Sequence, residues 1–549
     1  MPERRKLTYA PRAALKHICL PALQPASLYE SFDFERSPMN RYIDTRGNVS
    51  EPLTFCEAIV EGIAPGGGLF VPQDIPSMSV EKICELTKLP YAQRAARLYR
   101  TFDVDVASEE VDALMAGAYG AQFDDARVAP VVNLGDGIHI LELFHGPTSA
   151  FKDMALQCLP RFFEHATAKL RAEGKLDHDH LILVATSGDT GKAALEGFAG
   201  RERVSICVFY PDGGVSDIQL RQMTTQQGDN VNVFAARGDF DDCQTSVKQA
   251  FGDKAFCDRL LSEHGLALSS ANSINWGRLM PQIVYYMSAY ADLVASGSVA
   301  AGDTIDVCVP TGNFGNILAA YYAKRIGTPI ARLVCASNEN NVLTDFINTG
   351  VYDIRNRKLS LTPSPSMDIL VSSNLERQLF ELCGRDASRV RAWMANLSRD
   401  RRFEVDADTR ARLQELYVAG CVDNDACLAE IGRVFTEKHY LLDPHTAVAL
   451  KVAQGARSER PMLVASTAHW AKFGPNVWRG LNGLGANEPL PPEIAALSGI
   501  ELNRSIAEST GTSVPAGLEA LASLPRRFNT VVEASKTGIE SSVLGWLCD

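Results

Sequence analysis

The stretch "LILVATSGDTGKAALEGFAG", residues 181–200, joins two patterns that together specify a fold class. Residues 181–186 form a continuous apolar run, which is typical of a strand buried on both faces of a parallel sheet. A glycine-bearing turn follows, and residues 192–200 then show a helical pattern. A buried strand that leads through a turn into a helix is the repeating unit of an α/β fold.

The same unit recurs along the chain. Helical patterns follow most of the other strand-like apolar runs, which occupy residues 204–211, 230–237, 305–316, 330–337 and 461–469. Residues from about 355 to 460 are charged and are predicted to be mostly helical, as in residues 407–420 ("ADTRARLQELYVAG"). Buried strands that alternate with helices predict an α/β protein with a mostly parallel sheet and crossover helices.

Composition excludes several classes of protein. The 549 residues carry 54 basic and 66 acidic side chains, a net charge of −12, which argues against a general nucleic-acid binder. The 13 cysteines form no CxxC pair, so we expect free thiols and no metal site. No apolar run is long enough to cross a membrane. The first 25 residues are basic but lack the apolar core of a secretory signal, so we expect a cytoplasmic protein with a short irregular leader before Ser37. The alternative is a transit peptide, although the stretch has no serine before Ser27.

A lysine stands in unusual surroundings in "HGPTSAFKDMALQ", residues 145–157. Lys152 and Asp153 follow a Gly-Pro turn at the expected start of a helix, with apolar residues on both sides. A lysine among apolar groups loses its proton more easily and becomes a nucleophile for carbonyl groups. The alternative is an ordinary solvated Lys-Asp pair on a helix surface.

Three loops at expected strand ends are candidates for ligand binding, because ligands of doubly wound sheets lie at the carboxyl ends of the strands. The loop at residues 186–194 opens a helix whose N–H groups can bind an anion; the alternative is capping by Ser187 or Asp189. The loop at residues 310–316, "PTGNFGN", suits one phosphate monoester; the alternative is a turn without a ligand. It lacks the lysine of a nucleoside-triphosphate loop and the GxGxxG of a dinucleotide site. The third loop, "STAHWAKF" at 466–473, offers hydroxyl groups and His469, which is either a base or a structural residue.

Pyridoxal 5'-phosphate would use all of these parts, since it needs a lysine, a phosphate cradle and a partner for its ring nitrogen. Their order resembles the tryptophan-synthase-like pyridoxal-phosphate enzymes. Nine ordered segments narrow the resemblance to threonine synthase of the long form: "YIDTRGN", "PGGGLFVP", "HGPTSAFKD", "TSGDTGKAA", "NSINWGRLMPQ", "PTGNFGN", "PSMDI", "DPHTAVA" and "STAHWAKF". They run from Tyr42 to Phe473, most of the chain.

This resemblance implies a domain organisation. It implies two doubly wound, mostly parallel-sheet domains with an N-terminal family-specific domain. We place the N-terminal domain and leader at residues 1–120, the catalytic region at 121–500 and a C-terminal tail at 501–549. Within the catalytic region we expect a small α/β subdomain at about 155–265 and a helical insertion at about 355–440.

The resemblance also implies roles for single residues. Lys152 is expected to be the catalytic residue and to hold the cofactor as a Schiff base. Thr467 is expected to face the pyridine nitrogen. The cofactor phosphate is expected to be surrounded by Gly312, Asn313, Phe314, Gly315 and Asn316. The substrate's α-carboxylate is expected at Ser187, Gly188, Asp189 and Thr190, and the substrate's phosphate at Asn275 and Arg278, although a surface arginine is an equal alternative for the last.

The implied reaction is the last step of threonine biosynthesis. O-phospho-L-homoserine would lose phosphate from its γ-carbon after Lys152 removes the α-proton, and water would add at the β-carbon to give L-threonine. The family reads Ala-His-Pro-Ala-Lys-Phe in the last segment, where this chain has Trp470 in place of the proline. This departure leaves a phospho-lyase that releases 2-oxobutyrate open as an alternative. A second alternative, from another class, is a non-catalytic relative that binds the cofactor. We expect a monomer or homodimer.

Overall fold

The stretch at residues 181–200 forms the strand, turn and helix predicted for it, as β5 (Asp179–Ala185) followed by α7 (Asp189–Phe198). Both belong to a computed structural model that describes residues 39–548. The predicted leader before Ser37 lies outside the described residues.

Strand β5 lies in a five-stranded sheet with the order β15-β7-β6-β5-β8, in which every neighbouring pair is parallel. Its other strands are β6 (Val204–Pro211), β7 (Val231–Arg237), β8 (Leu266–Ser269) and β15 (Val531–Glu533). The predicted strands at 204–211 and 230–237 are confirmed. The helices that accompany this sheet are α7, α8 (Asp217–Thr224), α9 (Phe240–Gly252) and α10 (Lys254–His264).

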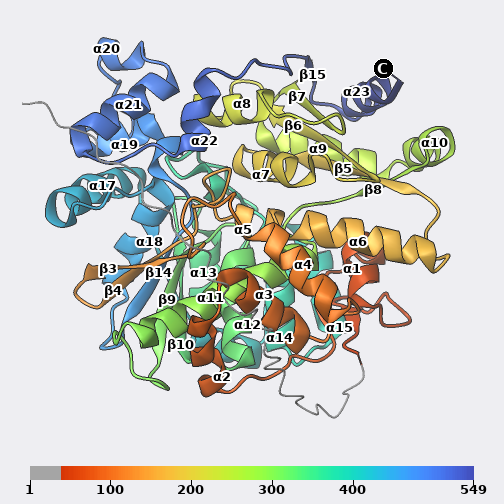
Figure 1. Ribbon diagram of the computed structural model, residues 1–549, viewed down its shortest axis with the longest axis horizontal. Helices are drawn as coiled ribbons and strands as arrows, with labels where there is room; N and C mark the ends of the chain where they lie inside the picture. The colour runs from red at the N-terminus through yellow and green to blue at the C-terminus, as the bar shows by residue number, and fades with distance from the viewer. Residues whose placement is uncertain (1–38, 549) are drawn as a thin grey trace, which may run out of the picture. The chain divides into compact units, whose positions relative to one another are not determined.

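Both faces of this sheet are covered, as the continuous apolar runs predict. Successive side chains of a strand point to opposite faces. Accordingly, Leu181 and Leu183 join a cluster with residues of α9, α10 and α23 (Lys536–Cys548), whereas Ile182 and Val184 pack with residues of α7 in the main core. Figure 1 shows this layer, with β5 to β8 in yellow and yellow-green.

A second, six-stranded sheet has the order β13-β10-β9-β14-β4-β3. Its pairs are parallel except for β3 and β4, which are antiparallel. The strands are β3 (Val131–Gly135), β4 (Ile138–Glu142), β9 (Ile305–Pro310), β10 (Ile330–Ser337), β13 (Tyr417–Cys421) and β14 (Met462–Ser466). Val307 and Val309 of β9 pack in the main core with residues of α11 (Trp276–Ala295) and α12 (Gly315–Ile326), while Cys308 packs with residues of α17 (Asn424–Lys438) and α18 (Pro444–Gly455). Two doubly wound sheets are thus present, as expected.

One helix prediction was wrong. Residues 407–420 divide into α16 (Ala407–Leu416) and the strand β13. Tyr417 is extended, and β13 pairs in parallel with the free edge of β10, from Leu333 opposite Tyr417 to Ser337 opposite Cys421. The backbone hydrogen bonds of this pairing outweigh a local helical pattern that is weak at an aromatic and a β-branched residue.

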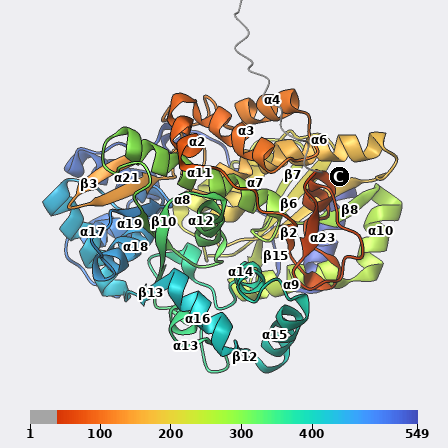
Figure 2. The same cartoon turned by 90° about the horizontal axis from the view of Figure 1, so that it is seen from below.

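The remaining segments surround the two sheets. Before β3 come the short strands β1 (Tyr42–Asp44) and β2 (Phe70–Pro72) and the helices α1 (Phe55–Glu61), α2 (Val80–Cys84), α3 (Tyr91–Thr101) and α4 (Ser108–Ala118). Figure 2 shows a group of helices together at one side: α13 (Val342–Thr349), α14 (Leu375–Leu382), α15 (Ala387–Asp400) and α16. The short strands β11 (Val351–Asp353) and β12 (Arg402–Glu404) pair within this part of the chain.

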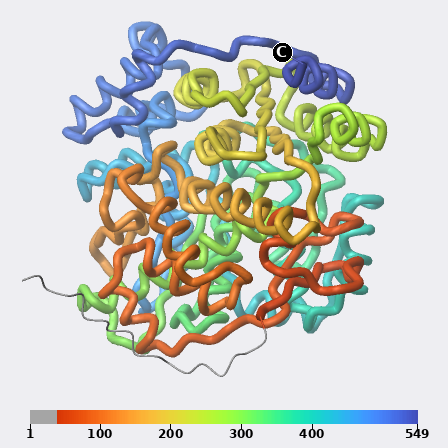
Figure 3. Tube along the Cα trace, turned by 45° about the vertical axis from the view of Figure 1, so that its right-hand side comes forward, coloured from red at the N-terminus to blue at the C-terminus, as the bar shows by residue number. Residues whose placement is uncertain are grey.

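The C-terminal segment returns to the five-stranded sheet. After α19 (Gly474–Leu481), α20 (Pro492–Ala495), α21 (Gly499–Thr510) and α22 (Ala516–Glu519), the chain adds β15 beside β7 and ends in α23. Figure 3 shows this blue segment running past the yellow part of the trace. The divisions at residues 120 and 500 remain predictions.

The structure also shows whether a helix could span a membrane and in what state the cysteines are. In the part of the chain from 39 to 548, no helix combines the length and the apolar character that a membrane span requires. The cysteines of this part are free thiols, most of them buried.

Candidate active site

Lys152 immediately precedes α5 (Asp153–Leu156) and α6 (Leu159–Ala172), at the place where a loop of one sheet meets a loop of the other. The preceding turn is built on a close approach: a Cβ on Gly146 would lie 2.4 Å from the Cβ of Asp153. The carboxylate of Asp153 accepts hydrogen bonds from the backbone N–H (2.8 Å) and the hydroxyl (2.7 Å) of Thr148. This turn fixes the start of the helix and with it the direction of the lysine.

The amine of Lys152 is buried and contacts two oxygens. Its Nζ lies 3.4 Å from Oδ2 of Asp189 and 3.2 Å from Oγ of Ser366. Burial lowers the pKa of Lys152 to about 8; Asp189 opposes this shift, whereas Lys472 and Arg278 add to it. Near neutral pH a measurable fraction of this amine is therefore uncharged, as a nucleophile for carbonyl groups requires.

Asp189 is the centre of the cluster. Its Oδ1 lies 2.8 Å from Nζ of Lys472 and accepts a hydrogen bond of 2.8 Å from Gln219, while its Oδ2 accepts one of 3.0 Å from the hydroxyl of Ser366. Burial alone would raise the pKa of Asp189, but Lys472 and Lys152 hold it well below its usual value. The protonation of Asp189, which the sequence leaves open, is therefore resolved in favour of a carboxylate.

The predicted phosphate cradle lies between β9 and α12. Phe314 precedes α12 in the left-handed conformation (φ 63°). A Cβ on Gly312 would lie 3.1 Å from the backbone oxygen of Ser366, so glycine admits the loop that contacts Lys152. Asn316 accepts hydrogen bonds from Tyr285 (2.8 Å) and Tyr286, while its buried Nδ2 has no partner among the described residues. An unpaired buried donor beside the first N–H groups of a helix suits a bound anion.

The other predicted cofactor residues lie at different depths. Asn313 is exposed, and its backbone oxygen accepts a hydrogen bond from Asn374 at 3.1 Å. Thr467 is buried directly after β14, and its backbone oxygen accepts a hydrogen bond of 2.8 Å from the N–H of Phe151, the residue before Lys152. The end of β14 and the lysine loop are thus joined through the backbone.

The departure from the family segment does not break this connection. Trp470 is buried at the start of the short helix η4 (Trp470–Lys472). The backbone N–H of His469 donates to the oxygen of Ser149 at 3.1 Å, and its ring Nδ1 accepts from the N–H of Ala471 at 3.2 Å. Burial lowers the pKa of His469 to about 3, so the ring is neutral and acts as a structural cap.

The two candidates for the substrate phosphate differ in their surroundings. The amide of Asn275 caps α11 by accepting from the N–H of Gly277 (2.9 Å) and donates to the oxygen of Ile59 (2.8 Å). Arg278 is also buried, but it donates only from Nη1 to the oxygen of Ala271 at 2.9 Å, and its Nε has no partner among the described residues. Within residues 39–548 its guanidinium forms no ion pair, so it is suited to bind an anion.

The loop before α7 supplies the predicted carboxylate site. Ser187 and Thr190 are half-buried there, and Gly188 has a φ of 126°. A Cβ on Gly188 would lie 2.4 Å from Cδ of Gln219, the side chain that contacts Asp189. Because Asp189 is ionised, it can offer an anion only its backbone N–H.

Sequence reasoning missed four residues of this cluster: Lys472, Ser366, Gln219 and His445. Three of them stand in segments already quoted for the family resemblance, "STAHWAKF", "PSMDI" and "DPHTAVA". Position inside these segments was the available signal. Nothing in a single sequence shows that a lysine after β14 meets an aspartate at the start of α7.

The parts present fit a phosphorylated aldehyde such as pyridoxal 5'-phosphate. The cluster holds a lysine that can be neutral, and the cradle holds an unpaired buried donor, Asn316 Nδ2, beside a glycine loop.

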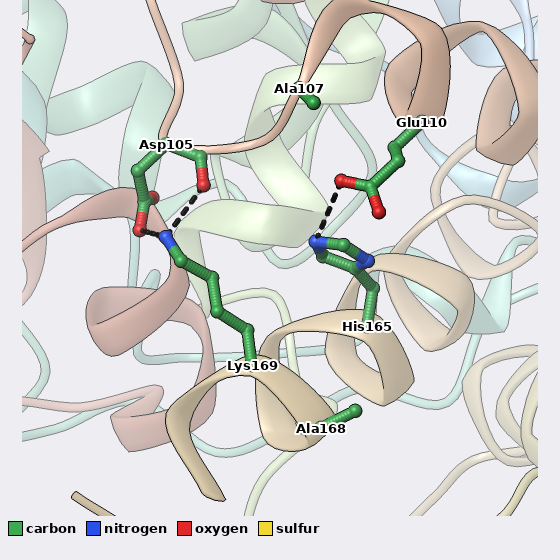
Figure 4. Close-up of a pocket in the computed structure, with 6 residues that line it drawn as sticks. All are labelled: Asp105, Ala107, Glu110, His165, Ala168 and Lys169. Carbon is green, nitrogen blue, oxygen red and sulfur yellow. Dashed lines mark hydrogen bonds and ion pairs between the residues drawn. The ribbon is translucent and has the colours of Figure 1, made fainter. Parts of the chain in front are cut away.

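A separate surface pocket shares none of these residues (Figure 4). Its ionisable side chains pair with one another, Lys169 with Asp105 and His165 with Glu110 at 3.7 Å. We assign no function to this pocket.

Known proteins resemble this chain in sequence and in fold. The family model "Threonine synthase N terminus" matches residues 41–119, and "Threonine synthase, C-terminal" matches residues 446–510. The threonine synthase of Pseudomonas aeruginosa is 39% identical over 462 residues, which cover 83% of this chain and 93% of that protein. The crystal structure of the PLP-bound threonine synthase from Brucella melitensis aligns with a TM-score of 0.79 at 37% identity and covers 93% of this chain and 100% of that chain.

A human protein, Threonine synthase-like 1, is 42% identical over 472 residues. The alignment covers 84% of this chain but only 62% of the human protein. This chain therefore spans less than two thirds of the length of that relative.

Proposed function

We propose, because this chain belongs to the threonine synthase family, that it binds pyridoxal 5'-phosphate and converts O-phospho-L-homoserine and water to L-threonine and phosphate. The observation that carries this proposal is the contact of Lys152 with Asp189 and Ser366, in which the amine is buried and its pKa is lowered to about 8. As a carbon–oxygen lyase, the protein would complete threonine biosynthesis. The cytoplasm and a monomer or homodimer remain the predicted compartment and oligomeric state.

The cofactor-binding residues follow from the cradle. Lys152 would hold the aldehyde end of the cofactor. The N–H groups of Gly315 and Asn316 and the free Nδ2 of Asn316 would bind its phosphate, with Gly312, Asn313 and Phe314 around it, and Thr467 would lie at the ring nitrogen. When bound, the cofactor withdraws electrons from the α-carbon of an amino-acid substrate. A hydroxyl at the ring nitrogen, unlike a carboxylate, need not keep that nitrogen protonated.

The chain's own groups would supply binding and proton transfer. Lys152, once free, is a base of suitable strength to remove the α-proton, because its pKa of about 8 lies near the working pH. The backbone N–H groups of Ser187, Asp189 and Thr190 at the start of α7 would bind the substrate carboxylate. Gly188 would allow its close approach, because its own N–H donates to the hydroxyl of Thr186 at 3.0 Å. Arg278 would bind the substrate phosphate through a charge-assisted contact, and its burial helps to exclude water from the reacting atoms.

A product assay tests this function. The protein loaded with pyridoxal 5'-phosphate is incubated with O-phospho-L-homoserine, and phosphate, threonine and 2-oxobutyrate are followed together. Threonine formed in equal amount to phosphate supports the synthase. Phosphate with 2-oxobutyrate would replace it with a phospho-lyase and direct attention to the segment of Trp470. Absence of phosphate release would favour the non-catalytic relative.

The assay needs a matched control. Lys152→Ala removes the proposed base and is expected to abolish all three products. Lys192→Ala removes another buried lysine, which lies on α7 and pairs with Glu196 at 2.9 Å. Lys192 forms no hydrogen bond or ion pair with Asp189 or Ser366 in the part of the chain that the structure describes. This variant is therefore expected to keep the product ratio of the parent protein.

A further inference from the structure

Lys472 is a second lysine in the cluster and is more deeply buried than Lys152. Its side chain is 0% exposed, its Nζ lies 2.8 Å from Oδ1 of Asp189, and it donates to the backbone oxygen of Thr148 at 2.9 Å. An ammonium group is buried only where it is paired, because removing it from water is costly. Lys472 is therefore a cation that the fold holds beside Asp189.

The single carboxylate of Asp189 is shared unequally between the two lysines. It lies 2.8 Å from Lys472 but 3.4 Å from Lys152. The other charged group that acts on Lys152 is Arg278 of α11, also a cation, whereas the neighbouring carboxylate of Asp153 is engaged by Thr148. Among the charged groups that act on Lys152, two cations thus oppose the single carboxylate of Asp189. Of the two lysines, Lys472 has the shorter contact with that carboxylate.

The longer contact, between Lys152 and Asp189, determines how firmly Lys152 holds its proton. A carboxylate beside an ammonium stabilises the charged form, and a second nearby cation opposes it. Without Lys472, the full charge of Asp189 would act on Lys152 and keep its proton in place. With Lys472 present, Asp189 is already compensated and can still accept hydrogen bonds from Gln219 and Ser366.

We infer that Lys472 is a positioning residue that acts through Asp189: it neutralises this carboxylate by a permanent ion pair and so leaves Lys152 free to be a neutral amine. The inference rests on the role proposed above for Lys152. It assigns to the lysine of "STAHWAKF" a task that requires no contact with the substrate.

The test measures the protonation of Lys152 directly in full-length protein freed of cofactor. The protein is labelled with a trace of acetic anhydride at a series of pH values, and the peptide that contains Lys152 is quantified by mass spectrometry. In the parent protein, labelling is expected to reach half its maximum near pH 8. In Lys472→Met, the midpoint is expected about one pH unit higher, which is about tenfold less labelling at pH 7.

Two further variants separate charge from structure. Lys472→Gln can still donate hydrogen bonds to Asp189 and Thr148 but has no charge, so it is expected to show the same upward shift and also serves if Lys472→Met fails to fold. Lys472→Arg keeps the charge and is expected to restore the parent midpoint. Lys192→Met breaks the ion pair between buried Lys192 and half-buried Glu196 on α7, the helix that begins at Asp189. It is expected to leave the midpoint in place.

The inference is overturned if folded Lys472→Gln labels with the parent midpoint, or if Lys192→Met shifts the midpoint as much as Lys472→Met does. Neither result depends on turnover. A parent protein that makes no threonine in the product assay would refute the proposed function, while the labelling midpoints would still decide the role of Lys472.

Discussion

The backbone N–H of Ser366 donates a hydrogen bond to Nε2 of His445 at 3.2 Å. This contact sets the tautomer of the ring: Nδ1 carries the proton and donates to Oδ1 of Asp443 at 2.8 Å. The hydroxyl of Ser366 in turn contacts both Lys152 and Asp189. A buried histidine at the start of α18 thus holds the loop that touches the proposed base.

Removing the His445 ring should therefore affect both stability and activity. His445→Leu loses two hydrogen bonds and leaves the buried carboxylate of Asp443 with fewer donors, a cost of about 1–3 kcal/mol in the free energy of unfolding. Urea denaturation measures this cost, and the specific activity of the folded fraction should fall about tenfold as Ser366 loses its support. His178→Leu, at a half-buried histidine that pairs with exposed Asp177, is the control. Full activity of folded His445→Leu would contradict the positioning role.

A glycine substitution tests the close approach beside Asp189. Gly188→Ala combines backbone strain at a φ of 126° with a Cβ 2.4 Å from Cδ of Gln219, so Gln219 must leave Asp189. Gly200→Ala, with a φ of 69° in the left-handed region and no atom within 4 Å of the new Cβ, has a milder backbone strain and no clash. We expect Gly200→Ala to lose about 1 kcal/mol and Gly188→Ala clearly more, with thermal unfolding as the measurement. Equal losses would show that Gln219 yields without cost.

The half-buried ring of His469 predicts a loss of stability in acid. Burial lowers its folded-state pKa to about 3, below the ordinary value of about 6.5 in the unfolded chain. The unfolded state therefore takes up the proton first, so the contribution is complete above pH 6.5 and is lost as the pH falls from there toward 3. At pH 5 the loss amounts to about 2 kcal/mol.

Substitution of His469 isolates this contribution. His469→Asn keeps an acceptor for the N–H of Ala471 but has no titrating group. Urea unfolding of both proteins at pH 7 and pH 5 should show a smaller drop for the variant, by about the amount expected from His469. An equal drop in both proteins would assign the acid sensitivity to other groups.

The sequence predicts the strands most accurately where burial on both faces leaves a continuous apolar run. The limits of β6 and β10 coincide with the runs at 204–211 and 330–337. Strand β13 was missed because its pairing with β10 depends on a partner that is distant in the chain, and four-residue β8 carries too short a pattern. Strand β15 likewise depends on the edge of β7.

The residues of the candidate site were likewise predicted only where the signal is local in the sequence. Lys152 and the loops after β5 and β9 were predicted, because glycines at strand ends and a lysine among apolar residues are visible locally. The partners of Asp189 were not, since Lys472, Ser366 and Gln219 each come from a different segment and meet only in the folded chain. A lysine in sequence looks the same whether it is solvated or buried beside a carboxylate.

The two candidates for the substrate phosphate can be separated by kinetics. Arg278 keeps an unpaired buried Nε, so Arg278→Met should remove a charge-assisted contact worth about 1.5–3 kcal/mol and raise KM for O-phospho-L-homoserine about 10- to 100-fold. Asn275 uses its amide to cap α11 and to hold Ile59, so Asn275→Ala should lower the unfolding temperature with a smaller change in KM. The strength of inhibition by inorganic phosphate is an independent measurement of the phosphate site, because only Arg278→Met should weaken this inhibition. If Asn275→Ala alone weakened phosphate inhibition while the protein stayed folded, the amide would have to turn from Ile59 toward the ligand, and the phosphate site would have to be reassigned to Asn275.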